Sequence, residues 1–242
     1  MVRHAGPRVD IRPQRCYAVP GQRGSMKILI ASAEPEEAQL AADLGAVGIL
    51  TNPALLAQTG PDWRKRLAAA MRLTDGPVHM QTTERSTERI LAQFEQFRRL
   101  AGERLVATVC MNQAGMAAAR KLQESLIPTN ITAVVTFNQA TVAAQSGADC
   151  VSIGFDRVAE GGPEGVGRLI EQLAAYLTRH RLETQIVATD VRNPDQYHRA
   201  AEAGAHLVAA PAGLLATIIS HHLTTRAIDE FEAAWKSITT IK

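Results

Sequence analysis

The chain lacks long apolar runs, a strong net charge and any cluster of cysteines, and each absence excludes a class of protein. No stretch of about 18 consecutive apolar residues occurs, so we expect no membrane span and no membrane partner. The formal net charge of +2 is too small to indicate nucleic-acid binding. Cys16, Cys110 and Cys150 are too scattered for a metal motif, which predicts reduced thiols in a cytoplasmic protein.

The remaining composition indicates one large globular domain behind a short arm. Of the 242 residues, 46% are hydrophobic and 21% charged, which is sufficient for one large core. Residues 1–25 carry five arginines and three prolines without hydrophobic periodicity, so we interpret them as a flexible arm, consistent with an upstream start codon before Met26. A secretory signal would need an apolar region that is missing, and Asp10 and the prolines fit an organellar signal poorly. We therefore expect the folded domain to span residues 26–242.

Short apolar runs alternate with helical patterns along this domain. Helix signals include Pro35 followed by acidic residues, and Gly45 as a stop. Glycine followed by alanine precedes three of the apolar runs, at Gly45, Gly147 and Gly204, which indicates a repeated helix-to-strand turn. The predicted strands are residues 27–30, 47–50, 77–81, 105–110, 131–135, 150–153, 186–188 and 207–210.

Eight strands that are each followed by helical sequence predict an α/β protein, a single (β/α)8 TIM barrel with a C-terminal closing helix at residues 228–238. Other predicted helices cover residues 35–44, 86–100, 113–124 and 168–180. A doubly wound open sheet is the alternative, but no G-x-G-x-x-G follows the first strand.

Polar side chains gather where the predicted strands end, which is the face of a barrel that carries function. These positions supply hydroxyls, amides, two arginines and two carboxylates, a set of groups suited to a sugar or polyol. In chain order the positions are Ala31, Ser32, Thr51, Asn52, His79, Gln81, Thr108, Cys110, Thr132, Ser152, Gly154, Asp156, Arg157, Asp190, Arg192, Ala210 and Pro211.

Two separated segments resemble the signatures of one enzyme family. Residues 51–56, T-N-P-A-L-L, resemble the T-T-N-P-S signature of transaldolases, and residues 130–140, N-I-T-A-V-V-T-F-N-Q-A, resemble their N-x-T-x-x-F-S-x-x-Q-A stretch. Arg157 and the closing segment 231–235 also match. The resemblance is strongest to the small, fructose-6-phosphate aldolase-like branch. It implies an aldolase of carbohydrate metabolism that forms a Schiff base between a lysine and a ketose.

The residue that this chemistry requires is replaced. The family's lysine lies on the fourth strand, and its position here is Thr108, whose hydroxyl cannot form an imine. By the same resemblance, Ala31 stands at the proton-transferring aspartate and Gly154 at the tyrosine that holds the catalytic water. Asp190 stands at a serine near the sugar phosphate. We therefore expect lysine imine chemistry to be lost, and the catalytic residues are unknown.

Another lysine is not placed to substitute. Lys27 begins the first strand, at the opposite end of the barrel, Lys65 and Lys121 fall on helices, and Lys236 and Lys242 close the chain. A metal-dependent aldolase would need a cluster of histidines and carboxylates. His79 is the only histidine near the mouth, so we expect no metal ion and no cofactor.

The binding groups of the family are partly kept, so we predict a ligand site made by Thr51, Asn52, Gln81, Thr132, Arg157 and Asp190. Several members have a purely structural alternative. Asn52 can be a helix cap before Pro53, and Thr136 with Gln139 is expected to be a capping box. Arg157 and Asp190 can bind an anion or each other, and we expect the ion pair because a carboxylate beside Arg157 would repel phosphate.

Three functions remain open from the sequence. The chain can be a transaldolase-like enzyme that uses a lysine-independent route, a barrel enzyme with acid–base chemistry at Asp190, Asp156 or Glu84, or a non-catalytic scaffold that keeps the barrel. Cys110 is a candidate nucleophile, although a strand cysteine without a neighbouring base is more typical of a buried filler. Phe231 and Trp235, four residues apart, predict a protein-packing face, and the family resemblance implies a homo-oligomer through this helix.

Overall fold

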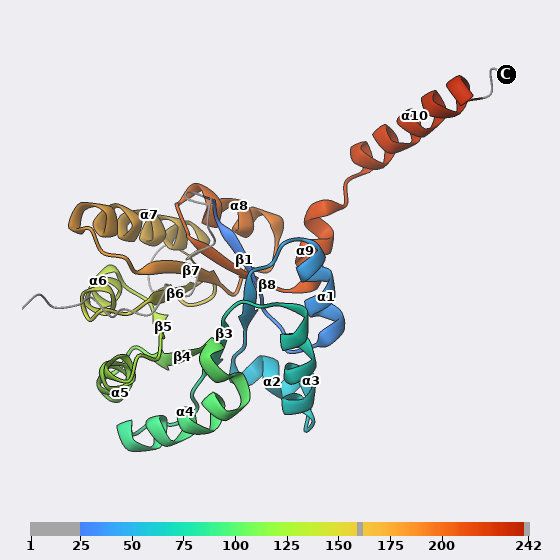
Figure 1. Cartoon of the computed structure of the whole chain (residues 1–242). Coiled ribbons are helices and arrows are strands. Elements are labelled where there is room, and N and C mark those ends of the chain that lie inside the picture. The colour runs from blue at the N-terminus through green and yellow to red at the C-terminus, as the bar shows by residue number, and fades with distance from the viewer. Residues whose placement is uncertain (1–24, 159–161, 240–242) are drawn as a thin grey trace, which may run out of the picture.

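The computed structural model describes residues 25–158 and 162–239 (Figure 1). The prediction of a flexible arm therefore lies outside the described residues, except for Ser25. Within the described part, no helix is both long and apolar enough to cross a membrane.

Eight parallel strands close into a barrel in sequence order. Closure is made by β1 against β8, where Lys27 to Ile30 align with Leu207 to Ala210. The predicted barrel is confirmed, and the open-sheet alternative is wrong because a doubly wound sheet would leave its edge strands unpaired. The strands are β1 Lys27–Ile30, β2 Gly48–Leu50, β3 Val78–Gln81, β4 Leu105–Cys110, β5 Thr129–Val134, β6 Cys150–Gly154, β7 Gln185–Thr189 and β8 Leu207–Ala210.

Helices surround the barrel and follow each strand. On most helices, buried apolar side chains, many of them alanine or leucine, meet the outer faces of the strands, which forms the main apolar core. The helices are α1 Pro35–Asp43, α2 Pro53–Thr59, α3 Trp63–Ala70, η1 Met71–Leu73, α4 Thr87–Ala101, η2 Gly102–Arg104, α5 Gln113–Glu124, α6 Phe137–Gln145, α7 Gly162–His180, α8 Pro194–Glu202, α9 Ala212–Ile219 and α10 His222–Thr239.

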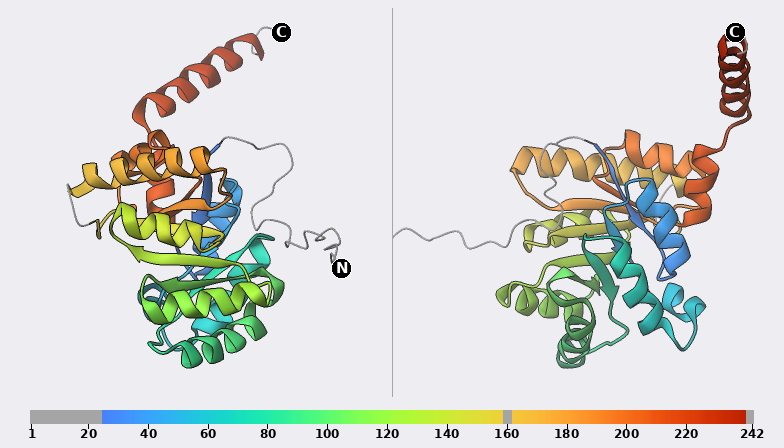
Figure 2. Two further views of the ribbon diagram at one scale, coloured as in Figure 1. Left: turned by 90° about the vertical axis from the view of Figure 1, so that its left-hand side faces the viewer. Right: turned by 45° about the vertical axis from the view of Figure 1, so that its right-hand side comes forward.

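The C-terminal part of the chain is divided between two helices. The helix α9 was not predicted, because its apolar residues follow no clear helical period. It packs against both α8 and α1 and so completes the ring of helices. The predicted C-terminal helix is α10, which begins six residues earlier than expected and projects away from the barrel (Figures 1 and 2).

Short polar caps connect several strands to the helices that follow them. The side-chain oxygens of Asn52, Asn112, Thr136 and Asn193 each accept a hydrogen bond from the backbone N–H three residues later. Such a cap stabilises a helix by about 1 kcal/mol. Thr136 is therefore a cap, as predicted, while Gln139 accepts from the N–H of Val135 rather than from the capping residue itself.

The barrel interior is apolar in its lower layer. Leu29, Cys150, Val187 and Leu207 are fully buried and belong to one small cluster. Each lies two residues before a residue that faces the open end of the barrel, and alternate residues of a strand share a face. The interior is thus closed below and polar above, so a ligand has one end from which to enter.

Candidate functional site

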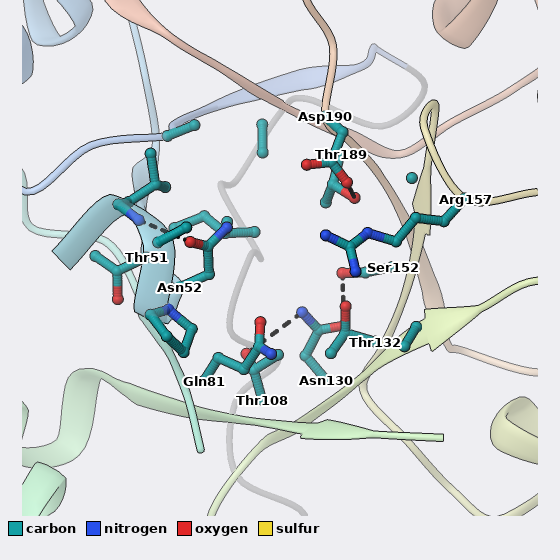
Figure 3. Close-up of a pocket in the computed structure, with 18 of the residues that line it drawn as sticks. Thr51, Asn52, Gln81, Thr108, Asn130, Thr132, Ser152, Arg157, Thr189 and Asp190 are labelled. Atoms are coloured by element: carbon teal, nitrogen blue, oxygen red, sulfur yellow. Dashed lines mark hydrogen bonds between the residues drawn. The ribbon is translucent and has the colours of Figure 1, made fainter. Parts of the chain in front are cut away.

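A cavity of about 430 Å³ opens at the carboxyl ends of the strands (Figure 3). Every strand or the loop that follows it contributes to its wall. The six predicted ligand-binding residues all line it, as do Thr108, Ala31 and Gly154, while their part in binding stays a prediction. The polar side chains of the wall are those of Thr51, Asn52, Gln81, Thr108, Asn130, Thr132, Ser152, Arg157, Thr189, Asp190 and Arg192.

Asn52 serves both as a cap and as part of this wall. Its Oδ1 accepts a hydrogen bond of 2.9 Å from the N–H of Leu55, which fixes the side chain at the start of α2. The amide NH₂ group is the remaining donor of this side chain for a ligand. The neighbouring Thr51 is buried, and its hydroxyl donates to the carbonyl of His79 across to β3.

A buried polar network forms the floor of the cavity. Asn130 is fully buried, accepts a hydrogen bond of 3.0 Å from the Ser152 hydroxyl, and directs its amide nitrogen to His79 Nδ1 at 3.2 Å. The same nitrogen lies 3.5 Å from the hydroxyl of Thr108. Since the amide donates to Nδ1, that nitrogen acts as an acceptor and the histidine is neutral. All four side chains are therefore uncharged, and the floor offers hydroxyl and amide groups only.

His79 lies below the cavity wall and not at the mouth. Its side chain has no exposed surface, and burial lowers its pKa to about 3. The expectation that His79 belongs to the mouth is wrong, because His79 lies two residues before Gln81 on β3 and therefore one layer deeper in the barrel. Among the described residues, no group of histidines, cysteines and carboxylates could hold a metal ion.

Two polar residues of this wall, Asn130 and Thr189, are not among the positions predicted from the strand ends. The signal for Asn130 was present, because it lies two residues before Thr132 and must share its face of the strand. The expected start of β5 at residue 131 excluded it, whereas the strand begins at Thr129.

None of the lysines that the structure describes lines the cavity. Lys27 begins β1, at the opposite end of the barrel. The Lys65 side chain is 86% exposed on α3, Lys121 is exposed on α5, and Lys236 pairs with Glu232 on α10. Lys242 lies outside the described residues. Thr108 itself is only 4% exposed, so the position on β4 offers a hydroxyl at the floor of the site.

Cys110 also lines the cavity, yet its environment does not favour a nucleophile. Burial raises the pKa of its thiol, and this outweighs the opposing effects of Arg157 and of Gln81, whose amide nitrogen is 3.9 Å from the sulfur. Because the thiolate is the reactive form, a raised pKa keeps the sulfur protonated and weakly reactive. This environment favours the filler interpretation.

Two arginines and two aspartates form the charged side of the mouth. Asp156 lies between Arg157, whose Nε is 3.2 Å from one carboxylate oxygen, and Arg192, whose Nη2 is 3.5 Å from the other. Arg157 thus pairs with the residue before it, and the expected ion pair with Asp190 is wrong. The expectation assumed a contact across two strands, but the loop after β6 brings Asp156 closer.

Asp190 faces the cavity from an unusual backbone conformation. Its φ is 56°, a left-handed value that aspartate tolerates better than most residues. Its Oδ2 occupies the space beside Gly154, where a Cβ atom would lie 2.5 Å from that oxygen. Burial, followed by the charge of Asp156 and a hydrogen bond to it, raises the pKa of Asp190, against the opposing effects of Arg157 and Thr189.

Comparison with known proteins assigns this barrel to a family. The family described as transaldolase/fructose-6-phosphate aldolase matches residues 28–242, almost the whole chain. The chain belongs to the transaldolase/fructose-6-phosphate aldolase family. The resemblance seen in the two sequence motifs is therefore confirmed, and the protein is a member of a family of carbohydrate metabolism.

Individual members of the family align over nearly their full length. A protein of Bacillus anthracis named "Probable transaldolase 2" is 34% identical over 217 residues, which cover 87% of this chain and 97% of the relative. A "Probable transaldolase" of Brevibacillus brevis is 31% identical, covering 88% of this chain and 99% of the relative.

A solved structure shares the fold at low identity. The match to a lactate oxidase of Pediococcus acidilactici has a TM-score of 0.51 and 16% identity, and it covers 76% of this chain and 62% of the other. At this identity the match supports the barrel fold alone.

Proposed function

We propose that this transaldolase-family barrel binds a sugar or polyol at its mouth without forming a lysine imine. The observation that carries this proposal is an open cavity of about 430 Å³ walled by hydroxyls and amides, with Thr108 on its floor and no described lysine in its wall. Hydroxyl and amide groups both donate and accept, which suits the hydroxyls of a polyol.

The surroundings of Thr108 support a binding role in place of nucleophilic catalysis. A hydroxyl becomes a nucleophile when a neighbouring base removes its proton. The Thr108 hydroxyl accepts a hydrogen bond of 3.5 Å from the amide of Asn130, which is no base, and the neutral His79 beyond it contacts that amide. Covalent catalysis at this position is therefore unsupported, whether through an imine or through an alkoxide.

Acid–base chemistry on a bound ligand is the second candidate, and one observation favours it over an inert scaffold. The cavity is open, and the pKa of Asp190 within it is raised, as is typical of carboxyl groups that exchange protons with a ligand. Glu84, by contrast, pairs with Arg89 at 2.8 Å and does not line the cavity. Asp190, with Asp156 beside it, is thus the better candidate among the three carboxylates considered.

Replacing Thr132 by valine tests the proposed site with little change in shape. The variant Thr132→Val removes one hydroxyl from the wall, and the loss of one neutral hydrogen bond should weaken ligand binding about 2- to 10-fold. Binding of dihydroxyacetone and of fructose is followed by titration calorimetry or by NMR line shifts. Thr141→Val is the matched control, since the Thr141 hydroxyl lies on α6 and donates to the carbonyl of Asn138. Equal affinities in the two variants would argue against the mouth as the binding site.

We further propose that the chain forms a homo-oligomer through α10. The exposed fractions of Ile228, Phe231, Trp235 and Ile238 lie between 57% and 72%, and their spacing places them on one face of the helix. Most of the stability of a protein helix comes from the packing of its apolar face, so a covering partner would stabilise α10. A second copy is the simplest such partner, because closed symmetric assemblies of one chain are the commonest oligomers. We also propose a cytoplasmic location, because Cys110 and Cys150 are thiols and not halves of a disulfide.

A further inference from the structure

The charged side of the mouth is electrically balanced before any ligand arrives. Arg157 and Arg192 are the two cations that line the cavity in the described part of the chain, and both contact the carboxylate of Asp156. Asp190 adds a second carboxyl group that faces the cavity directly. Arginine pairs often bind phosphate esters in two-point contacts. Here both arginines already pair with Asp156, and the carboxyl group of Asp190 faces the same cavity.

The backbone determines where the Asp190 side chain lies. Gly154 leaves the space that its carboxyl occupies, and the left-handed φ of 56° turns its side chain inward. The Thr189 hydroxyl lies 3.4 Å from Oδ2. Figure 3 shows Asp190 across the cavity from Gln81 and Thr108, so a ligand of a few carbons would meet the carboxyl at one end and the amide and hydroxyl groups at the other.

The surroundings of Asp190 show that negative charge is unfavourable at this point. Burial and the charge of Asp156 raise the pKa of the Asp190 carboxyl even though Arg157 acts in the opposite direction. A phosphate dianion in the same place would meet the same burial and two carboxylates. An ionised carboxylate, moreover, only accepts hydrogen bonds, and a phosphate dianion has no proton to donate, whereas each hydroxyl of a polyol has one.

We propose that Asp190 is the specificity-determining residue of the mouth and selects an uncharged polyol or ketose against its phosphate ester. The carboxylate accepts hydrogen bonds from ligand hydroxyls at the end of the cavity near Gly154. Asp156 pairs with Arg157 and Arg192, and Asp190 adds the second negative charge, so the two arginines present no net positive charge to a phosphate group. This assignment deepens the proposed function and rests on it for the identity of the ligand, but not for the exclusion of phosphate.

The test compares a matched pair of ligands with inorganic phosphate. Fructose, fructose 6-phosphate and inorganic phosphate are titrated into the full chain and into Asp190→Asn, which keeps the shape and tolerates the left-handed backbone. Asp190→Gly is a second variant that also suits this conformation. Asp195→Asn is the control, because it removes one negative charge on α8 that pairs with Arg199 outside the cavity.

We expect the wild-type chain to prefer fructose, and Asp190→Asn to shift the affinity ratio at least about tenfold towards fructose 6-phosphate. Inorganic phosphate should bind Asp190→Asn more tightly than the wild type, and the added change Arg157→Ala should remove this gain. An unchanged ratio together with unchanged phosphate binding would overturn the assignment, as would a wild-type preference for the phosphate ester. If no variant binds fructose but phosphate binding still rises in Asp190→Asn, the proposed sugar site fails while the exclusion by Asp190 stands.

Discussion

Thr108→Lys is expected to form a covalent adduct with a ketose that the wild-type chain does not form. The new amine would rise from the floor of a cavity that is otherwise lined by hydroxyls and amides, with room above it for a small carbonyl compound. A lysine that is partly removed from water has a lowered pKa and is more often the neutral amine that attacks a carbonyl. The adduct is trapped by borohydride after incubation with dihydroxyacetone or fructose, and it is detected by intact mass.

A second lysine variant separates a shaped site from mere reactivity. Thr141→Lys places an amine on the outside of the barrel, on α6, and should give no adduct beyond the background of the native lysines. Circular dichroism checks that Thr108→Lys is folded, because the threonine is only 4% exposed and a larger side chain must extend into the cavity. A folded Thr108→Lys that stays unmodified would show that the mouth is not shaped for a ketose.

Serine at both Phe231 and Trp235 is expected to convert an oligomer into a monomer. These two aromatic residues are 72% and 67% exposed on α10, and burying each against another copy would contribute about 1.5–3 kcal/mol. Since both chains of a dimer carry the substitutions, the interface would lose several kcal/mol of binding free energy, which is sufficient to change the assembly at micromolar concentration. Size-exclusion chromatography with light scattering measures the mass of the particle.

The control for this variant lies on the opposite face of the same helix. Asp229→Ser with Ala233→Ser changes two residues that point away from the apolar face, and should leave the mass of the particle unchanged. A wild-type chain that is already a monomer at high concentration would contradict the proposed oligomer.

Much of the fold could be predicted because the pattern repeats. A parallel barrel strand is buried on both faces, so it appears as a short apolar run, and β4 and β8 were predicted to the residue. The start of β5 was missed because Thr129 and Asn130 are polar, although both are fully buried, Asn130 inside the barrel and Thr129 against Gln123 of α5. Periodicity could not separate α9 from the loop before it, since its residues are apolar on nearly every side.

The candidate site was predictable as a place but not as a set of contacts. Strand ends identify the mouth, and all six predicted residues line the cavity. The spacing of residues along a strand does not reveal how deep each lies in the barrel. His79 was therefore predicted at the mouth, although it lies one layer below it. The pairing of Arg157 with Asp156 depends on how the loop after β6 turns, and no pattern in the sequence determines that turn.

The measurement that tests the account most directly is borohydride trapping of the wild-type chain with dihydroxyacetone and with fructose 6-phosphate, followed by intact mass and peptide mapping. We expect no added mass, because the wall of the cavity presents the Thr108 hydroxyl and no described lysine amine. A single added ketose on one lysine, abolished by competing ligand, would contradict the account and restore imine chemistry to this member of the family.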